Sequence, residues 1–467
     1  MKISGIRKIT SAFFVSLLIL FLASCSCYMK TDLGNESIDV SITRKKNASG
    51  NTGIILTFNE VSSELDIPDF LQGMPVIKIV FADATNLSSL TKITIPESVT
   101  EIDTFEKASS LSTVELPDNL AYLPSFKGCA KITSITIPSK ITEIPASCFE
   151  DCTSLTKITT KGTDNTNSNT NETLADTLEG IKAIGKRAFY GCKVLSSIAL
   201  ETTEITVLNE LTFYNCISLS EVKLPATVIT IDDDAFNNCT KLTTVEGFEN
   251  VEKVGKKVFY SCESLKNIKL NSEITEISRE EKKNESVETK VIKIPDSLFN
   301  GCKSLESITI PNGVTTLGNS IFANCKALTE LNIPENIETL SSNLCNGCTA
   351  LETLNLPTTL TEIDSSAIKG CNGLKEIICK AINPPSIDAT NSLSVNDLKN
   401  DLIIYVPDDS ISDYKSVWGK VFEFSEDTGN ENPSESETSE TTETDPSKTT
   451  GDTQKPARIL IKGLSTI

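Results

Sequence analysis

The 467-residue sequence contains no histidine. A chain without imidazole cannot build a Ser-His-Asp or Cys-His nucleophilic centre, and it lacks the commonest nitrogen ligand for metals. No glycine-rich phosphate loop is present, and no pair of acids stands in a recognisable pocket motif. We therefore expect a protein that is not an enzyme, with no catalytic residue, no metal site and no cofactor.

Basic residues are scarce. Lys and Arg total 43 against 63 Asp and Glu, which gives a formal net charge of −20. Because nucleic-acid binding requires a basic face, we do not expect a nucleic-acid partner.

The sequence has no apolar run long enough to span a membrane. Its longest, Ala12–Ala23, follows three basic residues and fits a secretory leader over residues 1–24. The sequence Leu22-Ala-Ser-Cys25 resembles the bacterial lipobox, which implies cleavage before Cys25 and a lipid on its thiol. A plain leader cut nearby, which would leave Cys25 as an ordinary thiol, is the alternative.

One stretch, Phe236-Asn-Asn-Cys239-Thr-Lys-Leu242-Thr-Thr-Val245, recurs along the chain. We use the aliphatic residue after the Leu as a marker. The twelve markers are Ile93, Val114, Ile135, Ile158, Ile198, Val222, Val245, Ile268, Ile308, Leu331, Leu354 and Ile377. Their steps are 21, 21, 23, 40, 24, 23, 23, 40, 23, 23 and 23 residues. A fixed period of this kind indicates a repeat array, and the two steps of 40 indicate normal turns that carry insertions.

Each marker lies in a short alternating segment. In Ile308-Thr-Ile310-Pro311, the two Ile residues point one way and Thr309 the other, as in a strand, and the Pro ends the strand. A second aliphatic pair follows, and then usually a Phe. One unit cannot enclose these groups, so we expect neighbouring units to stack around a shared core.

The frame Phe-x-x-Cys-x-x-Leu-x-x-Ile-x-Leu-Pro resembles the BspA-type leucine-rich repeat of bacterial surface proteins, over roughly residues 53 to 423. The resemblance implies an α/β repeat solenoid of about twelve leucine-rich repeats, with a parallel sheet on a concave face and a cap at each end. It implies a binding role and no chemistry.

The remaining segments complete a predicted domain organisation. It comprises a signal peptide (1–24), a polar tether (25–52), an N-terminal cap (53–86), repeats (87–380) with insertions at about 161–178 and 278–290, a C-terminal capping module (381–424), and an acidic low-complexity disordered tail (425–467). The insertions are either functional loops or tolerated surface additions. The apolar Ile459-Leu-Ile461 near the end of the tail is either a strand partner or a remnant. The single Trp, Trp418, is expected in a short helix packed over the last repeat.

Ten of the fifteen cysteines occupy one position of the repeat. In a secreted protein, fifteen cysteines could form disulfides. A cysteine that recurs once per turn at an inward position is instead expected to be a small buried hydrophobe. Tyr190, Tyr214 and Tyr260, which follow the repeat Phe, either line a contact stripe or cover the edge of the array. Asp232-Asp-Asp234 suggests calcium only weakly, because no further spaced ligands follow.

The residues beside each marker are expected to point outward from the concave face, which is small, polar and without aromatic anchors. The charged candidates for ligand binding on it are Lys92, Glu115, Lys157, Glu221, Lys223, Glu246, Lys269 and Glu330. We therefore expect a lipid-anchored, extracytoplasmic protein of the outer membrane or cell surface, with adhesin-like binding to a matrix protein, a glycan or another bacterial surface protein. The alternative is a periplasmic structural or scaffold protein without an external ligand.

Overall fold

A computed structural model of the chain describes residues 27–32, 37–46, 52–71, 73–83, 85–162, 177–277, 292–391, 393, 396–425 and 457–467. They belong to a parallel-strand solenoid of about 14 turns with little helix. The chain divides into two compact units, which we describe separately: unit 1 is Met1–Ser286 with Ser297–Lys303, and unit 2 is Val287–Asp296 with Ser304–Ile467.

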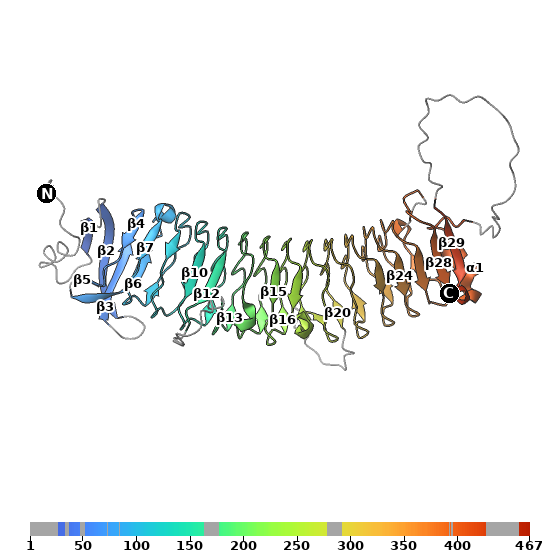
Figure 1. Cartoon of the computed structure of the whole chain (residues 1–467), viewed down its shortest axis with the longest axis horizontal. Coiled ribbons are helices and arrows are strands. Elements are labelled where there is room, and N and C mark those ends of the chain that lie inside the picture. The colour runs from blue at the N-terminus through green and yellow to red at the C-terminus, as the bar shows by residue number, and fades with distance from the viewer. Residues whose placement is uncertain are drawn as a thin grey trace, which may run out of the picture. The chain divides into compact units, whose positions relative to one another are not determined.

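Unit 1 holds strands β1 to β19, and Figure 1 shows its successive turns running from blue to yellow-green. The strands are β1 (Cys27–Asp32), β2 (Ser37–Lys46), β3 (Thr52–Phe58), β4 (Glu64–Asp66), β5 (Phe70–Leu71), β6 (Met74–Phe81), β7 (Lys92–Thr94), β8 (Glu101–Ile102), β9 (Thr113–Val114), β10 (Ser134–Ile137), β11 (Glu143–Ile144), β12 (Lys157–Thr160), β13 (Ala183–Ile184), β14 (Val207–Leu208), β15 (Glu221–Lys223), β16 (Thr230–Ile231), β17 (Thr244–Glu246), β18 (Lys253–Val254) and β19 (Thr275–Glu276). Three short 3-10 helices complete the described part of this unit: η1 (Leu87–Ser89), η2 (Leu200–Thr202) and η3 (Phe248–Asn250).

Unit 2 holds strands β20 to β29 and α1, the helix over Ile411–Trp418. The strands are β20 (Lys293–Ile294), β21 (Thr316–Leu317), β22 (Glu330–Asn332), β23 (Thr339–Leu340), β24 (Thr353–Leu356), β25 (Glu362–Ile363), β26 (Glu376–Cys379), β27 (Ser386–Ile387), β28 (Leu402–Val406) and β29 (Ile459–Gly463). Its 3-10 helices are η4 (Ala389–Asn391), η5 (Asp408–Ser410) and η6 (Leu464–Thr466).

Most turns contribute two strands. These strands pair in parallel with the equivalent strands of neighbouring turns, so two separate ladders form. The strands that carry the markers pair with one another, as in β10 with β12, β15 with β17, and β22-β24-β26. The second aliphatic pair of the repeat, which the sequence left without a secondary structure, forms strands of its own, as in β14-β16-β18 and β23-β25-β27. We call the outward surface of the marker-carrying strands the marker face.

The register confirms the period inferred from the sequence, because markers pair with markers. Ile135 pairs with Ile158, and Val222 with Val245. The register also adds a turn before the first marker, where Leu65 pairs with Ile93, and one after the last, where Ile377 pairs with Ile404. Their separations of 28 and 27 residues differ from the usual 23, which explains why the sequence period did not find them.

The core consists of columns of equivalent side chains. In unit 1, Phe126, Phe149, Phe189 and Phe213 stack at centroid distances of 5.3 to 5.6 Å, and all are fully buried. Aromatic pairs at such distances add to the stabilisation from apolar burial. The stacking of neighbouring turns therefore encloses the core that a single turn could not.

The turn around the repeat Phe depends on left-handed backbone conformations. Two non-glycine residues, Leu211 and Lys257, have φ of 60° and 56°. The equivalent residues Arg187, Asp234 and Ser297 share this conformation. L-amino acids other than Asn, Asp and Gly adopt it rarely, so the solenoid imposes a local conformation that the residue types alone would not predict.

Residues 25–52 are not simply a polar tether, and that prediction is wrong for residues 27–32 and 37–46. β1 and β2 form an antiparallel hairpin, and β2 continues into the sheet by pairing with β3. The alternating Ile38, Val40 and Ile42 are the signal that a reading of overall polarity missed. Val40 is 3% exposed.

The prediction of disorder for residues 425–467 is also wrong for its last eleven residues. β29 pairs in parallel with β28 along five residues, and Ile459 is fully buried. Arg458 Nη2 lies 2.8 Å from Asp401 Oδ2 and reinforces the junction. The acidic residues 426–456 lie outside the described part of the chain.

The short helix and its buried Trp are confirmed. Trp418 is fully buried, and its Nε1 donates to the Pro385 carbonyl at 2.8 Å. Tyr414 packs edge-on against it at 5.0 Å. That residues 381–424 and 53–86 act as caps stays a prediction.

Three other predictions fall mainly outside the described residues. The signal peptide and Cys25 lie entirely outside the described residues. Residues 163–176 of the first insertion and the whole second insertion, 278–290, also lie outside them. Within the described part, no helix is both long and apolar enough to cross a membrane.

Candidate functional site

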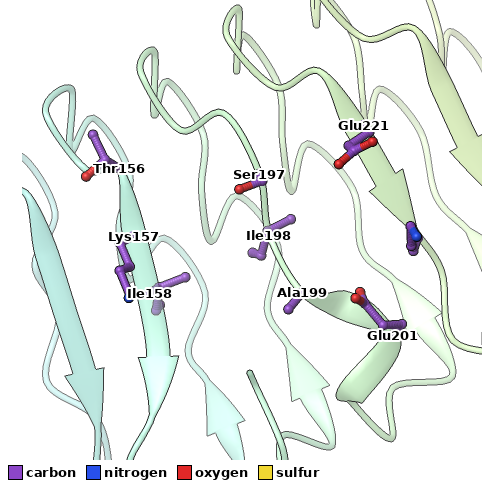
Figure 2. A pocket seen from close by; sticks show the side chains of 9 residues that line it. Thr156, Lys157, Ile158, Ser197, Ile198, Ala199, Glu201 and Glu221 are labelled. Atoms are coloured by element: carbon purple, nitrogen blue, oxygen red, sulfur yellow. The ribbon is translucent and has the colours of Figure 1, made fainter. Parts of the chain in front are cut away.

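A hollow of about 190 Å³ interrupts the marker face in unit 1. Figure 2 shows Lys157 on β12 at one side, Glu221 on β15 at the other, and the segment Ser197–Ala199 between them. The remaining lining side chains include Glu201 and Lys223. We call this feature the marker-face hollow.

The hollow exists because the ladder of marker strands is broken there. β10 pairs with β12 and β15 pairs with β17, but the segment around Ile198 lies in neither strand set. The step from Ile198 to Val222 is 24 residues rather than 23, and η2 follows Ile198 where seven other units carry a Pro. The extra residue alone does not account for the break, because the segment around Ile308 also lies outside the strands although its step to Leu331 is 23 residues.

Charges of both signs surround the marker-face hollow. Lys157 and Lys223 come from the strands on its two sides, and Glu201 and Glu221 add carboxylates. Lys223 Nζ lies 3.6 Å from Glu246 Oε2 on the next strand, and both side chains are about half exposed or more. Such an exposed pair contributes little to stability, so these groups remain available to a charged or polar partner.

Of the eight charged candidates, three line this hollow: Lys157, Glu221 and Lys223. All eight are exposed, as the alternation of the strands predicted. Lys92 lies on β7, Glu115 follows β9, Glu246 lies on β17, and Lys269 lies in a turn without a marker strand. Glu330 lies on β22 in unit 2. The structure therefore gathers three of these residues and spreads the others along the marker face.

A second hollow, of about 440 Å³, lies on the marker face of unit 2. Its lining includes Asn332 and Asn355 on neighbouring strands, and Asn355 Nδ2 donates to Asn332 Oδ1 at 2.6 Å. Glu335 is also in the lining. The Thr358 backbone N–H donates to Glu335 at 2.9 Å and is the main cause that lowers the pKa of that carboxyl. Glu335 was missed as a site residue because it follows Pro334, beyond the alternating segment.

The cysteine column is buried and offers no reactive thiol. All ten repeat cysteines are buried, and burial raises the pKa of Cys129 to about 12. Because the thiolate is the reactive form, these thiols are suited to packing rather than to redox chemistry.

Among the described residues, no group of three or more acids or cysteines is placed to hold a metal ion. The acidic turn at Asp232–Asp234 accepts backbone hydrogen bonds: Asp232 Oδ1 accepts the Asp233 N–H, and Asp233 Oδ1 accepts the N–H of Lys256 in the next turn.

The stacked parallel turns and the aliphatic marker ladder define a leucine-rich repeat solenoid. The chain belongs to the BspA-type leucine-rich repeat family, whose repeat region of six copies matches residues 80–172, 163–286 and 281–387. A leucine-rich repeat array is consistent with binding to proteins or other macromolecules. No curated protein matches the sequence.

Several solved structures are similar to this chain. A leucine-rich repeat protein from Bacteroides ovatus is 24% identical, with a TM-score of 0.46, over 73% of this chain and 93% of that one. A leucine-rich cell surface protein from Faecalibacterium prausnitzii is 20% identical, with a TM-score of 0.38, over 83% and 97%. The pneumococcal vaccine antigen PcpA is 14% identical, with a TM-score of 0.38, over 94% and 100%.

Proposed function

We propose that this protein is anchored by a lipid on Cys25 outside the cytoplasm and binds an extended macromolecule along its marker face, without catalysis. The observation that carries the proposal is the exposed polar surface of the marker strands, broken by the marker-face hollow with Lys157, Glu221 and Lys223 around it. A shallow polar surface of this kind suits many weak contacts with an extended partner, such as a matrix protein, a glycan or another bacterial surface protein.

Each hydrogen bond exchanged with water brings only about 1 kcal/mol, so a single copy should bind with modest affinity. Many anchored copies that engage one partner together would raise the avidity. Lysines at the contact should make binding weaker as salt increases.

The binding test uses the purified mature protein against immobilised matrix proteins, glycans and bacterial surface proteins. The variant K157E/K223E/K269E reverses the charges of Lys157 and Lys223 on the marker face and that of Lys269 beside the marker Ile268. The matched control K131E/K193E/K241E makes the same change at exposed lysines outside the marker strands. We expect capture to fall, together with its salt dependence, in the first variant only. Unchanged capture in the first variant would contradict the marker-face assignment, above all if removal of the insertion at 161–178 or 278–290 abolished binding.

Location is tested separately by protease treatment of intact cells. A surface protein is removed, whereas the alternative, a periplasmic scaffold, is protected. The variant C25A should release the protein from the membrane fraction or leave it unprocessed. Unaltered detergent partitioning of that variant would exclude the lipid anchor.

A further inference from the structure

A second surface in unit 1 is formed by the residue that follows each repeat Phe, and it lies outside the marker face. In successive turns this position is occupied by Tyr190, Tyr214, Asn237, Tyr260 and Asn300. We call it the edge column. All five residues line one open cavity of about 680 Å³.

Two tyrosines of the edge column stack directly on each other. The rings of Tyr190 and Tyr214 lie parallel within 3°, with centroids 4.9 Å apart. The Arg187 guanidinium lies 3.8 Å from the centroid of Tyr190. This cation–π contact occupies a face of the Tyr190 ring. This part of the edge column therefore has no gap between Arg187, Tyr190 and Tyr214.

The stack is interrupted in the next turn, where Asn237 replaces a tyrosine. The Asn237 side chain is 7% exposed, and its Nδ2 donates to Asp234 Oδ1 at 2.6 Å. This hydrogen bond fixes the short amide in place. A tyrosine returns one turn later at Tyr260, so a single ring is missing from the column between Tyr214 and Tyr260.

The core beneath the column sets the size of this gap. Phe213, Phe236 and Phe259, which precede the three edge residues, stack at 5.5 and 5.7 Å with nearly parallel rings. Tyr214 and Tyr260 are therefore separated by about two such steps. A ring inserted at the level of Asn237 would lie within the 4.5–7 Å range of stacking distances from both tyrosines.

We propose that the gap at Asn237 is a binding slot for one pyranose ring of a glycan, held between Tyr214 and Tyr260. A pyranose carries C–H bonds on both faces, so it can pack against both tyrosine rings at once. The cavity also provides polar partners for the ring hydroxyls, because Asp234, Lys257 and Asn300 line it. A flat aromatic side chain without polar atoms would offer these groups no hydrogen bond, whereas the sugar hydroxyls can donate and accept.

This proposal goes beyond the marker-face function and does not depend on it, since none of the slot residues lines the marker-face hollow. A single sugar has few atoms, so its affinity for the slot should be weak, with a Kd on the order of 1 mM. A longer glycan would gain from contacts beyond the slot.

The test is saturation-transfer NMR on the purified mature protein. The probes are the methyl glycosides of glucose, galactose, mannose and N-acetylglucosamine, and phenol serves as the flat-ring probe. We expect at least one glycoside to receive saturation at its ring C–H protons and to bind more tightly than phenol. The variant N237Y fills the gap with the residue found at the same position in the turn on either side, so it should fold and should weaken glycoside binding about tenfold or more.

Two further variants make the outcome specific. Y260A removes one wall and should also abolish binding, whereas Y122A, which removes an exposed tyrosine elsewhere in unit 1, should leave it unchanged. A normal melting temperature of N237Y establishes that its loss of binding is local. The proposal is overturned if no glycoside receives saturation, if phenol binds at the slot in preference to every sugar, or if glycoside binding persists in N237Y.

Discussion

The thiol of Cys239 donates a hydrogen bond to the carbonyl oxygen of Phe213, in the preceding turn, at 3.2 Å. The same carbonyl accepts the backbone N–H of Cys216 within its own turn at 3.1 Å. Both lone pairs of the Phe213 oxygen are thus occupied. Equivalent thiol contacts recur at Cys192, Cys216, Cys262, Cys302 and Cys348, at 3.0 to 3.2 Å. The repeat cysteine therefore fills the core and also links each turn to the one before it.

Thiol accessibility provides the first prediction. Desolvation raises the pKa of the Cys239 thiol well above its ordinary value, and all ten column thiols are buried. In native buffer at neutral pH, a maleimide reagent should leave the ten column cysteines unlabelled, and all ten should react in denaturant. Mass spectrometry of labelled peptides measures this directly. Rapid native labelling of several column cysteines would contradict the packing of the turns.

The sequence was sufficient for the repeated part of the fold and insufficient at its irregularities. Pairs such as Ile135 with Ile158 follow from the period, because one inward aliphatic per turn must lie beside the next. β29 did not follow, because parallel pairing with β28 joins segments separated by an acidic stretch that carries no signal of pairing.

The candidate sites could likewise be predicted from the sequence only where they follow the regular repeat. The outward direction of Lys157 and Lys223 could be derived from strand alternation. The hollow between them forms where the segment around Ile198 lies outside the marker strands, and this irregularity could not be read from the local sequence pattern. The gap at Asn237 was equally hidden, because its meaning depends on the stacked Tyr214 beside it.

The second prediction concerns the C-terminal strand. Ile459 is fully buried, whereas Ile461 is only partly buried. The variant I459A should destabilise unit 2 by about 2 to 4 kcal/mol through lost burial and a residual cavity, and I461A should cost clearly less. Urea unfolding, followed through the fluorescence of Trp418, measures both. Removal of residues 457–467 should lower stability at least as much as I459A, and an unchanged midpoint would show that β29 does not pair with β28.

The third prediction follows from the left-handed turn at Lys257. Its φ is 56°, and its side chain is exposed, so its backbone strain is not offset by side-chain burial. Asparagine tolerates this conformation better than lysine, and K257N should raise stability by about 0.5 to 1 kcal/mol. The control K253N makes the same change in β18, where the backbone is extended and asparagine is disfavoured. It should leave stability unchanged or lower it, and equal gains in both variants would exclude the conformational explanation.

The last prediction uses the buried carboxylate of Glu150, which is 5% exposed. Arg187 Nη2 lies 2.6 Å from one carboxylate oxygen, and Lys127 Nζ lies 3.2 Å from the other. The hydrogen bond from Arg187 is the main cause that lowers the pKa of Glu150 from its ordinary 4.5 to about 2. Because the folded pKa is the lower one, this contribution to stability is complete above pH 4.5 and is lost as the pH falls toward 2.

The variant E150Q removes that contribution and leaves two cations without their carboxylate. At pH 7 it should unfold more easily than the wild type by on the order of 2 to 3 kcal/mol, and the difference should shrink steadily between pH 4.5 and 2. The control E263Q breaks the exposed pair between Glu263 and Lys303, which should contribute less than about 1 kcal/mol at any pH. The denaturant midpoints of the wild type, E150Q and E263Q, measured between pH 7 and pH 2, test this prediction. A difference between wild type and E150Q that stays constant down to pH 2 would mean that packing, and not the ion pair, accounts for the loss.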